Sequence, residues 1–499
     1  MMLCMLVLIP LAGGFLAWFA GRWSALLARW ISLAVMVADF VLVIMLWARH
    51  FDAAGLATGT PWLEEFRHAW IPQLGISFYL AVDGLSLLMV ALSGFIGIMA
   101  VLVSWKEVNE RVGIYYGCLL WVLCGIIGVF MALDLFLFYF FWEVMLVPMY
   151  FLIGVWGHEN RIYAAIKFFL FTLAGGLLML LSILALYFVH GNQPGASYTF
   201  DYNELLGTPM ASSTSMWIML GFFVAFAVKL PAVPLHNWLP DAHTEAPTAG
   251  SLVLAALLLK TGAYGLIRFV VPLFPEASAV LAPFALWLGV FGIIYGAVLA
   301  FGQNDLKRLV AYTSVSHMGF VLIGVFSWNM LALQGTVMQM ICHGISTGAL
   351  FMIVGMLYKR IHTRDMTRMG GLWAAVPRMG GVAMVFAMAS LGLPGLGNFV
   401  GEFLVLFGVF KISLPVTVAA LLGIVAATVY SLRIIQNTFH GSGRTAWKMA
   451  DLNKREMLEM LAMIAAIVWL GVWPFLVIET AKPALEALLR MVPALLGVG

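Results

Sequence analysis

Long apolar runs recur along the whole chain and are separated by short stretches that carry most of the polar residues. A helix needs roughly 20 mostly apolar residues to cross a bilayer, and by this criterion the pattern predicts about 14 crossings. Their approximate centres are Ile9, Val41, Ala91, Val122, Leu146, Met179, Val224, Leu257, Leu288, Met318, Ser346, Met388, Gly423 and Ala465. The pattern therefore predicts an all-α integral membrane protein with one polytopic membrane domain over residues 1–499.

Two of the predicted crossings are interrupted. The seventh reaches Lys229 and is then broken by Pro231, Pro234 and Pro240, and the twelfth is broken within residues 391–403, LGLPGLGNFVGEF. Proline removes a backbone donor and clashes with the preceding turn, so a continuous helix cannot run through it. Broken backbone is tolerated inside a membrane where protein or water surrounds it, and transporters place ion sites there. We predict two discontinuous helices; the alternative for the seventh is a solvated loop outside the bilayer.

Composition supports the membrane assignment. Of the 499 residues, 63% are hydrophobic and 10% are charged, and the mean hydropathy is +1.02. A soluble domain carries about 25% charged residues. The net charge of +3 comes without a basic patch that could hold a nucleic acid. The four cysteines stand singly in apolar segments and are interpreted as small core residues. The first apolar run lacks the basic start of a cleavable signal, so it is predicted to be retained as a helix.

The distribution of lysine and arginine predicts the orientation. Loops after odd-numbered crossings hold sixteen of these residues, including Lys307 and Arg444, and loops after even-numbered crossings hold six, including Arg268. The four that lie within crossings are Lys167, Lys229, Lys260 and Arg433. Basic residues are enriched in cytoplasmic loops. We therefore expect the odd-to-even loops in the cytoplasm and both termini on the periplasmic, outer face.

The ionisable residues within the crossings have a regular spacing. Two trios are each separated by 85 or 86 and then by 31 positions: Glu143, Lys229 and Lys260, and His317, Glu402 and Arg433. Five crossings, an odd number, separate the start of the two units, so the second is inverted, as in many ion-coupled transporters. The alternative is a chance spacing, since the two proline breaks do not superpose. The predicted organisation is N-terminal helices, two inverted five-helix repeats, and a C-terminal loop with the last helix: 1–110, 111–271, 272–440 and 441–499.

Buried charges are the first candidates for chemistry. A charged side chain at the centre of a membrane helix costs about 2.5–3.5 kcal/mol, so Glu143, Lys229, Lys260 and Glu402 need a partner or water. Glu143 has no basic neighbour close in sequence, and Lys229 is its candidate partner from another helix. Burial favours the neutral form of both side chains, whereas a close opposite charge keeps both ionised. The pair is predicted to act as a proton switch; the alternative is a static ion pair that only fixes helix packing.

Three histidines are weaker candidates: His236, His317 and His343. A lone histidine on an apolar helix is commonly a core residue, but its ordinary pKa near 6.5 also suits a proton relay. Their spacing does not match a zinc site, so no metal is predicted. Asp241 and His243 follow the break, where a cap or loop role and a proton entrance are both open. Two aspartates near helix starts, Asp83 and Asp134, are interpreted as N-caps.

Several of these segments together resemble a known family: FWEVMLVPMYF, FAVKLPAVPLHNWLPDAHTEAPTAGS, LLKTGAYGLIR, LKRLVAYTSVSHMG and GNFVGEF. They are similar to the antiporter-like subunits of respiratory complex I, the proton-pumping NADH–quinone oxidoreductase, which are related to the Mrp cation/proton antiporters. The resemblance covers nearly the whole chain. It is closest to the bacterial M-type subunit, because Glu402 stands where L- and N-type subunits carry a lysine, and because the chain ends soon after its last crossing.

The resemblance implies roles for the candidate residues. Glu143 and Lys229 would form the control pair, Lys260 the central relay, and His317 and His343 would lead towards Glu402 on the exit side. His236 is kept as a relay candidate. The chain itself would hold no cofactor, because NAD, FMN, iron–sulfur clusters and quinone are expected in other subunits, and a quinone contact at HNWLPDAH stays open.

The resemblance also implies where the chain works. The expected partners are L-like and N-like antiporter subunits and small membrane subunits in the bacterial plasma membrane. The predicted function is proton translocation driven by quinone reduction elsewhere in the complex. The alternatives are an Mrp-type antiporter or membrane-hydrogenase subunit, and a structural spacer without its own channel.

Overall fold

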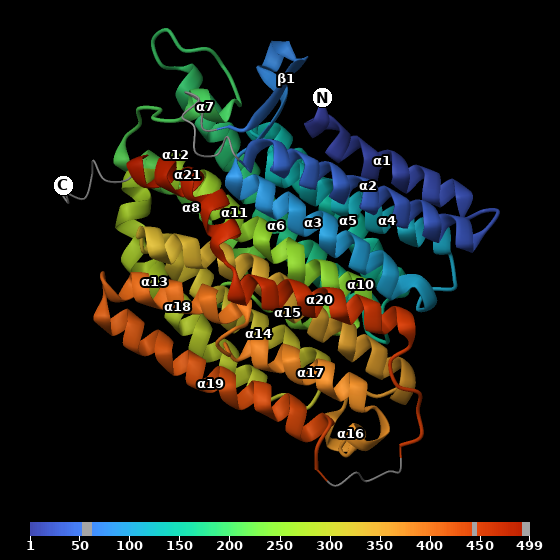
Figure 1. Ribbon diagram of the computed structural model, residues 1–499. Helices are drawn as coiled ribbons and strands as arrows, with labels where there is room; N and C mark the ends of the chain where they lie inside the picture. The colour runs from blue at the N-terminus through green and yellow to red at the C-terminus, as the bar shows by residue number, and fades with distance from the viewer. Residues whose placement is uncertain (52–61, 442–446, 492–499) are drawn as a thin grey trace.

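The computed structural model describes residues 1–51, 62–441 and 447–491, most of which are helical (Figure 1). The first helices are α1 (Met2–Ala20), α2 (Ala25–Phe51), α3 (Gly84–Val103), α4 (Val112–Met131), α5 (Leu135–Trp156) and α6 (Arg161–Gly191). The middle of the chain forms α7 (Tyr202–Leu205), α8 (Ser212–Lys229), α9 (Trp238–Glu245), α10 (Thr248–Val253), α11 (Leu259–Gly265), α12 (Val271–Leu273), α13 (Pro275–Phe301), α14 (Leu306–Phe326) and α15 (Met330–Ile361). The last helices are α16 (Leu372–Ala375), α17 (Pro377–Ser390), α18 (Gly397–Phe410), α19 (Leu414–Thr438), α20 (Lys454–Val472) and α21 (Phe475–Met491).

The described residues contain 12 helices that are long and apolar enough to cross a membrane, or 13 if the bent pair α20 and α21 counts as one crossing. This pair is bent by 67°. The predicted number of about 14 is not reached by this measure. The reason is that the twelfth predicted crossing consists of α17 and α18, which have 14 residues each and are too short to be counted.

Both predicted breaks are present. Helix α8 ends at Lys229, and α9 begins only at Trp238, after two of the three prolines. Helix α17 ends at Ser390, and the following turn contains Gly392 and Gly395 at φ +78° and +93°, which glycine adopts without steric cost. The inverted repeats and their boundaries stay predictions. Arg444 and parts of the predicted segments 1–110 and 441–499 lie outside the described residues.

A β-hairpin interrupts the otherwise helical chain and was not predicted from the sequence. Strands β1 (Glu64–Ile71) and β2 (Ile76–Val82) pair in antiparallel fashion around a 3₁₀ turn, Pro72–Leu74. The hairpin lies with α7 at one end of the helical bundle (Figure 1). The backbone N–H of Leu133 donates to the carbonyl of Tyr79, which ties the hairpin to the start of α5.

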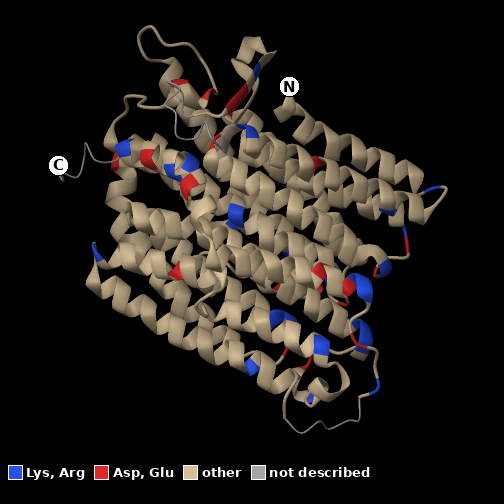
Figure 2. Cartoon of the chain, in the orientation of Figure 1, with Lys and Arg blue, Asp and Glu red and all other residues tan. Residues whose placement is uncertain are grey.

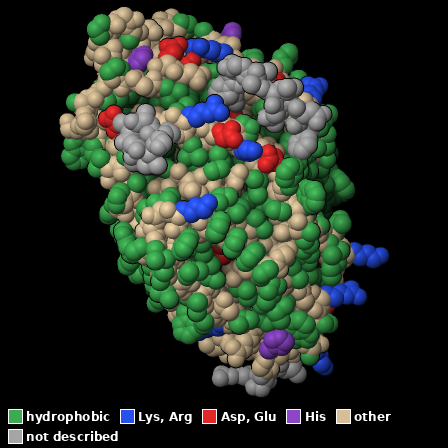
Figure 3. Space-filling model, turned by 60° about the vertical axis from the view of Figure 1, so that its left-hand side comes forward, with side chains coloured by type: hydrophobic (Ala, Val, Ile, Leu, Met, Phe, Trp, Pro, Cys, Tyr) green, Lys and Arg blue, Asp and Glu red, His purple; other side chains and the backbone are tan. Residues whose placement is uncertain are grey.

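Charges are concentrated at the two ends of the bundle. Few Lys, Arg, Asp or Glu residues lie in its middle (Figure 2). Hydrophobic side chains cover most of the middle of the surface in Figure 3. Two basic residues that were predicted to lie in loops are instead buried. Arg268 is 9% exposed within the crossing formed by residues 248–273, and Lys307 is 3% exposed in the first turn of α14. Each of the two predicted groups of loops thus loses one basic residue, so the excess of lysine and arginine on one face remains.

The eighth predicted crossing, residues 248–273, is the centre of the fold. It is wholly buried, and α3, α8 and α15 pack against it. Its helix is not regular, because two π-helical turns, Leu254–Leu258 and Leu266–Val270, flank α11. Such wide turns are rare and are found frequently at functional sites. Lys260 lies in α11, between them.

Candidate functional site

Lys229 occupies an apolar and aromatic pocket at the end of α8. Its side chain is fully buried, and Nζ lies 5.2 Å from the centre of the Trp142 ring and 5.4 Å from that of Phe168. A cation is attracted to the faces of such rings. Within the described part of the chain Nζ has no hydrogen-bonding partner, and neither has Oε1 of the half-buried Glu143. Trp142 directly precedes Glu143 on α5, so the predicted partners are near each other, but the ion pair is not closed.

The position of Glu143 depends on a glycine of α6. A Cβ atom placed on Gly176 would lie 2.7 Å from Oε1 of Glu143, closer than side chains tolerate. The absence of a side chain at this position therefore gives the carboxylate its place between α5 and α6. The sequence analysis did not identify Gly176.

Lys260 contacts the next candidate residue directly. Its Nζ lies 2.7 Å from Nδ1 of His343 on α15 and donates to the carbonyl of Ala255 at 2.5 Å. Ala255 belongs to the π-helical turn, where the wider spacing leaves its carbonyl available to a side chain five residues later. Lys260 and His343 are both fully buried.

The row continues from His343 to the break between α17 and α18. The ring centroids of His343 and His317 are 5.5 Å apart, and Nδ1 of His317 lies 2.9 Å from Oε1 of Glu402. Glu402 also faces the broken backbone, because its Oε2 lies 3.0 Å from the place where a Cβ of Gly392 would be. Four of the predicted residues thus form one buried row: Lys260, His343, His317 and Glu402.

Three further polar side chains hold this row, and the sequence analysis missed them. Nε2 of His317 lies 3.2 Å from the hydroxyl groups of both Ser390 and Tyr430. Nε2 of Gln339 donates to Oε1 of Glu402 at 3.0 Å. Gln339 could have been predicted from the sequence, because it stands four positions before His343 on an apolar helix and so faces the same side.

His236 lies apart from this row. It follows α8 in the broken stretch, and its ring packs against Tyr295, with the centroids 5.5 Å apart. Neither ring nitrogen has a hydrogen-bonding partner among the described residues. His243, on α9, stacks on Phe351 of α15 at 4.5 Å. The structure thus places His236 outside the contacts that join the other candidates.

Asp241 takes part in two ion pairs. Its carboxylate pairs with Lys167 at 2.6 Å and with Arg308 at 3.0 Å, so it joins α9 to α6 and α14. Arg433 is also not equivalent to the buried Lys260, its counterpart in the predicted repeat. It is only partly buried on α19 and donates to the carbonyl of Phe301.

The predicted N-caps are confirmed. Asp83 accepts from the backbone of Ser86 at the start of α3, and it also pairs with Arg268, which is buried. Asp134 accepts three backbone N–H groups, those of Ser77, Phe136 and Leu137. Burial raises the pKa of Asp134 to about 6. Among the described residues, no group of three or more His, Cys, Asp or Glu side chains is arranged to hold a metal ion.

Known proteins share this arrangement of elements over nearly the whole chain. Residues 132–429 match the model of the NADH:quinone oxidoreductase/Mrp antiporter membrane family. NADH-quinone oxidoreductase subunit M of Pseudomonas aeruginosa is 53% identical, with 99% of each chain covered. Subunit M of Escherichia coli K12 is 52% identical, with 97% of each covered. The chain belongs to the subunit M family of NADH-quinone oxidoreductase.

The fold agrees with this assignment. A chain of respiratory complex I from Thermus thermophilus has a TM-score of 0.89 and 32% identity, and the match covers 99% of this chain and all of the other. The chain is therefore an antiporter-like, multi-span subunit of the membrane arm of a bacterial respiratory complex that acts as a translocase. The predicted family is confirmed, whereas the roles of individual residues are not tested by these similarities.

Proposed function

We propose that this chain carries protons across the bacterial plasma membrane through its buried Glu, Lys and His residues. The observation that supports this most directly is the row Lys260, His343, His317 and Glu402, with polar contacts of 2.7 and 2.9 Å at its two ends. The 5.5 Å between the two imidazole rings is a distance that a small ring rotation or one bridging water spans. A histidine accepts a proton at one nitrogen and gives one up at the other.

In this proposal each residue has one task. The Lys260 ammonium gives a proton to Nδ1 of His343, and the proton passes by way of His317 to Glu402. From Glu402 it leaves through the broken backbone between α17 and α18. His236 lies outside the contacts of this row and stays a relay candidate beside the broken stretch after α8.

Glu143 and Lys229 would control the row. Moving one charge through a membrane potential of about 150–200 mV requires roughly 3.5–4.6 kcal/mol. Two opposite charges 4 Å apart interact by about 4 kcal/mol at an effective dielectric constant of about 20. Closing and opening the Glu143–Lys229 pair therefore changes the protonation free energy of Lys229 by about the amount needed to move one proton against the membrane potential. Quinone reduction elsewhere in the complex would drive this movement.

The wider setting follows from the family. NAD, FMN, iron–sulfur clusters and quinone would be bound by other subunits, and the L-like and N-like antiporter subunits and small membrane subunits would be the neighbours. Both termini would lie on the periplasmic face. The 52–53% identity to subunit M favours this assignment over an Mrp-type antiporter or a membrane-hydrogenase subunit. Copurification with NADH-oxidising subunits distinguishes these candidates.

The test replaces Lys260 by alanine in the whole complex. In inverted membrane vesicles, NADH oxidation and acidification of the lumen are measured together, and the matched control is Lys411→Ala, at an exposed lysine after α18. We expect at least a tenfold loss of proton transport for Lys260→Ala and no loss for the control. An assembled Lys260→Ala complex with undiminished pumping would instead support a structural spacer.

A further inference from the structure

A cavity opens at the end of the bundle that carries the basic loops. Its volume is about 230 Å³, and it lies between the connection of α3 to α4, the first turn of α14, the end of α15 and the first turns of α20. All four elements adjoin odd-to-even loops, the predicted cytoplasmic face. Charged side chains line this cavity, among them Glu107, Lys307, Arg455, Glu456 and Glu459.

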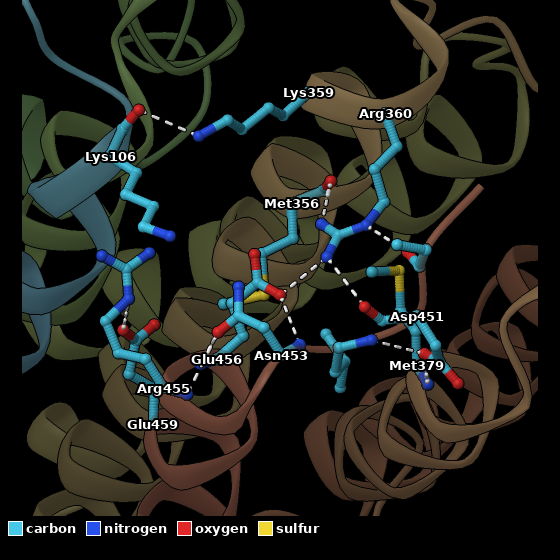
Figure 4. Close-up of polar contacts among 12 residues, drawn as sticks. Lys106, Met356, Lys359, Arg360, Met379, Asp451, Asn453, Arg455, Glu456 and Glu459 are labelled. Atoms are coloured by element: carbon cyan, nitrogen blue, oxygen red, sulfur yellow. Dashed lines mark hydrogen bonds and ion pairs between the residues drawn. The ribbon is translucent and has the colours of Figure 1, made fainter.

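Most charged groups of this cavity are engaged in fixing its walls. Oε1 of Glu107 accepts from both the N–H and the hydroxyl of Thr248. Oε2 of Glu456 accepts from Arg360 at 2.6 Å and from the backbone of Asn453 at 2.9 Å (Figure 4). These two carboxylates therefore hold α10, α15 and α20 in place.

Three further basic or imidazole groups of the cavity have other tasks. Lys359 donates to the carbonyl of Lys106 (Figure 4), and Arg364 donates to the carbonyl of Thr244. Burial, followed by the charges of Lys307 and Arg364, lowers the pKa of His158 to about 3. His158 is therefore neutral at physiological pH and does not collect protons.

Glu459 is different from the other carboxylates. Its side chain is fully buried, and Arg455, one turn earlier on α20, is its ion-pair partner at 3.2 Å (Figure 4). Neither carboxylate oxygen has a well-directed hydrogen bond from any described residue. Arg455 approaches through Nε, which itself lacks a well-directed acceptor there. A buried carboxylate held this loosely is costly when ionised, and it gains by taking up a proton.

Lys307 also lines the cavity and connects it to the end of α9. Its Nζ donates to the carbonyl of Ala246, directly after α9, at 2.5 Å. His243 lies one turn earlier on α9, and its ring nitrogens have no partner within the described ranges. Its ring stacks on Phe351 of α15, the helix that also carries His343. His243 is therefore the buried imidazole of α9 that lies next to both the Lys307 contact and α15.

We propose that this cavity is the entrance through which protons reach the row from the basic-loop face, with Glu459 as the first acceptor. A proton from water adds to the Glu459 carboxylate. The Lys307 ammonium gives a proton to His243 and regains one from Glu459, and His243 passes its proton to the neutral amine of Lys260. Each step moves one proton, and no electron is transferred. This inference rests on the proposed function but names a separate set of residues.

The first test uses Glu459→Gln and Glu459→Asp in the whole complex, with Glu479→Gln, at a partly exposed residue of α21, as the matched control. We expect Glu459→Gln to lower proton transport at least threefold at pH 7.5 and to recover as the pH on the basic-loop face falls. Glu459→Asp should restore most of the transport. A merely structural glutamate would give a loss that does not depend on pH, and that result would overturn the proposal.

Lys260→Ala is measured in the same vesicles to separate two kinds of failure. Pumping that persists in Lys260→Ala refutes the proposed function. Pumping that is lost in Lys260→Ala but unchanged in Glu459→Gln refutes the entrance alone. The comparison thus assigns a negative result to one of the two proposals.

The second test does not require a change at Glu459. Val354 on α15 lines the cavity and is 4% exposed, so Val354→Cys introduces a thiol there at little steric cost. A charged, membrane-impermeant thiol reagent is added to either face of the vesicles. We expect labelling from the basic-loop face only, together with a severalfold loss of pumping. Labelling from neither face, or labelling without loss of transport, would contradict an entrance at this place.

Discussion

The ammonium of Lys260 lies 2.7 Å from Nδ1 of His343, and both groups are fully buried within the bundle. The contact joins α11 to α15 and needs His343 to be unprotonated at Nδ1, because the ammonium is itself a donor. The two residues thus share protons along one line rather than forming two independent sites. This relationship is the basis of the first prediction.

Replacing Lys260 and His343 together should be no worse than replacing either one alone. We expect Lys260→Met and His343→Leu each to lower proton transport at least tenfold, and the double variant to equal the more severe single variant, because groups that act as a unit are not additive. Proton transport per NADH oxidised is the measurement, with the exposed His68→Ala as the control. Losses that multiply in the double variant would show that the two residues act separately.

Gly176→Ala should damage pumping without damaging the fold. The added methyl group would lie 2.7 Å from Oε1 of Glu143 and push the carboxylate aside, and we expect proton transport to fall about twofold to tenfold. Alanine is favoured over glycine within a helix by about 1 kcal/mol, so the melting temperature should not fall. Gly381→Ala is the matched control, because its Cβ would meet no atom within 4 Å. Unchanged transport in Gly176→Ala would remove Glu143 from the proposed switch.

Asp83→Ala should destabilise the subunit strongly. The variant leaves the buried Arg268 without its carboxylate, and loss of one partner from a buried pair costs about 3–5 kcal/mol. Thermal unfolding of the solubilised complex measures the effect, and Asp83→Ala combined with Arg268→Met should recover part of the loss. By contrast, Glu479→Ala breaks a partly exposed pair with Lys482 and should cost about 0–1 kcal/mol. An equal loss of thermal stability in Asp83→Ala and Glu479→Ala would be evidence against a stabilising role of the buried Asp83–Arg268 pair.

The stability of α5 should depend on pH through Asp134. Burial raises the pKa of this residue to about 6 in the folded chain, so between the ordinary pKa near 3.8 and about 6 the folded state holds a proton that the unfolded state has lost. Stability should therefore fall as the pH rises through this window, by at most about 1.4 kcal/mol per pH unit. Asp134→Asn should remove this component from unfolding curves measured between pH 4 and pH 7. An identical pH dependence in the variant would contradict the assignment.

The sequence revealed residues whose burial is costly, but not every partner that satisfies them. Lys229, Lys260 and Glu402 were identifiable because a charge in an apolar run stands out on energetic grounds alone. Ser390 and Tyr430 were not, since uncharged polar residues are common in membrane helices and only the meeting of α17, α19 and α14 gives them a partner. Long-range contacts of this kind have no local sequence signal.

The fold shows the same limit. Proline spacing predicted the break after Lys229, because its cause is local. The β-hairpin of residues 64–82 was missed, since it is short and lies between strongly apolar runs. Arg268 was placed in a loop by hydropathy, whereas its pairing with Asp83, 185 positions earlier, keeps it inside the bundle.

The complete enclosure of residues 248–273 affects how the chain is made. This segment leaves the ribosome before α14 and α15, which later pack on it, and until then Lys260 lacks its contact with His343 of α15. An unpaired charge of this kind costs about 2.5–3.5 kcal/mol in lipid, so the nascent segment is poorly held on its own in the bilayer. Stable insertion of residues 248–273 therefore depends on α14 and α15, which are synthesised later and hold this segment in the bundle.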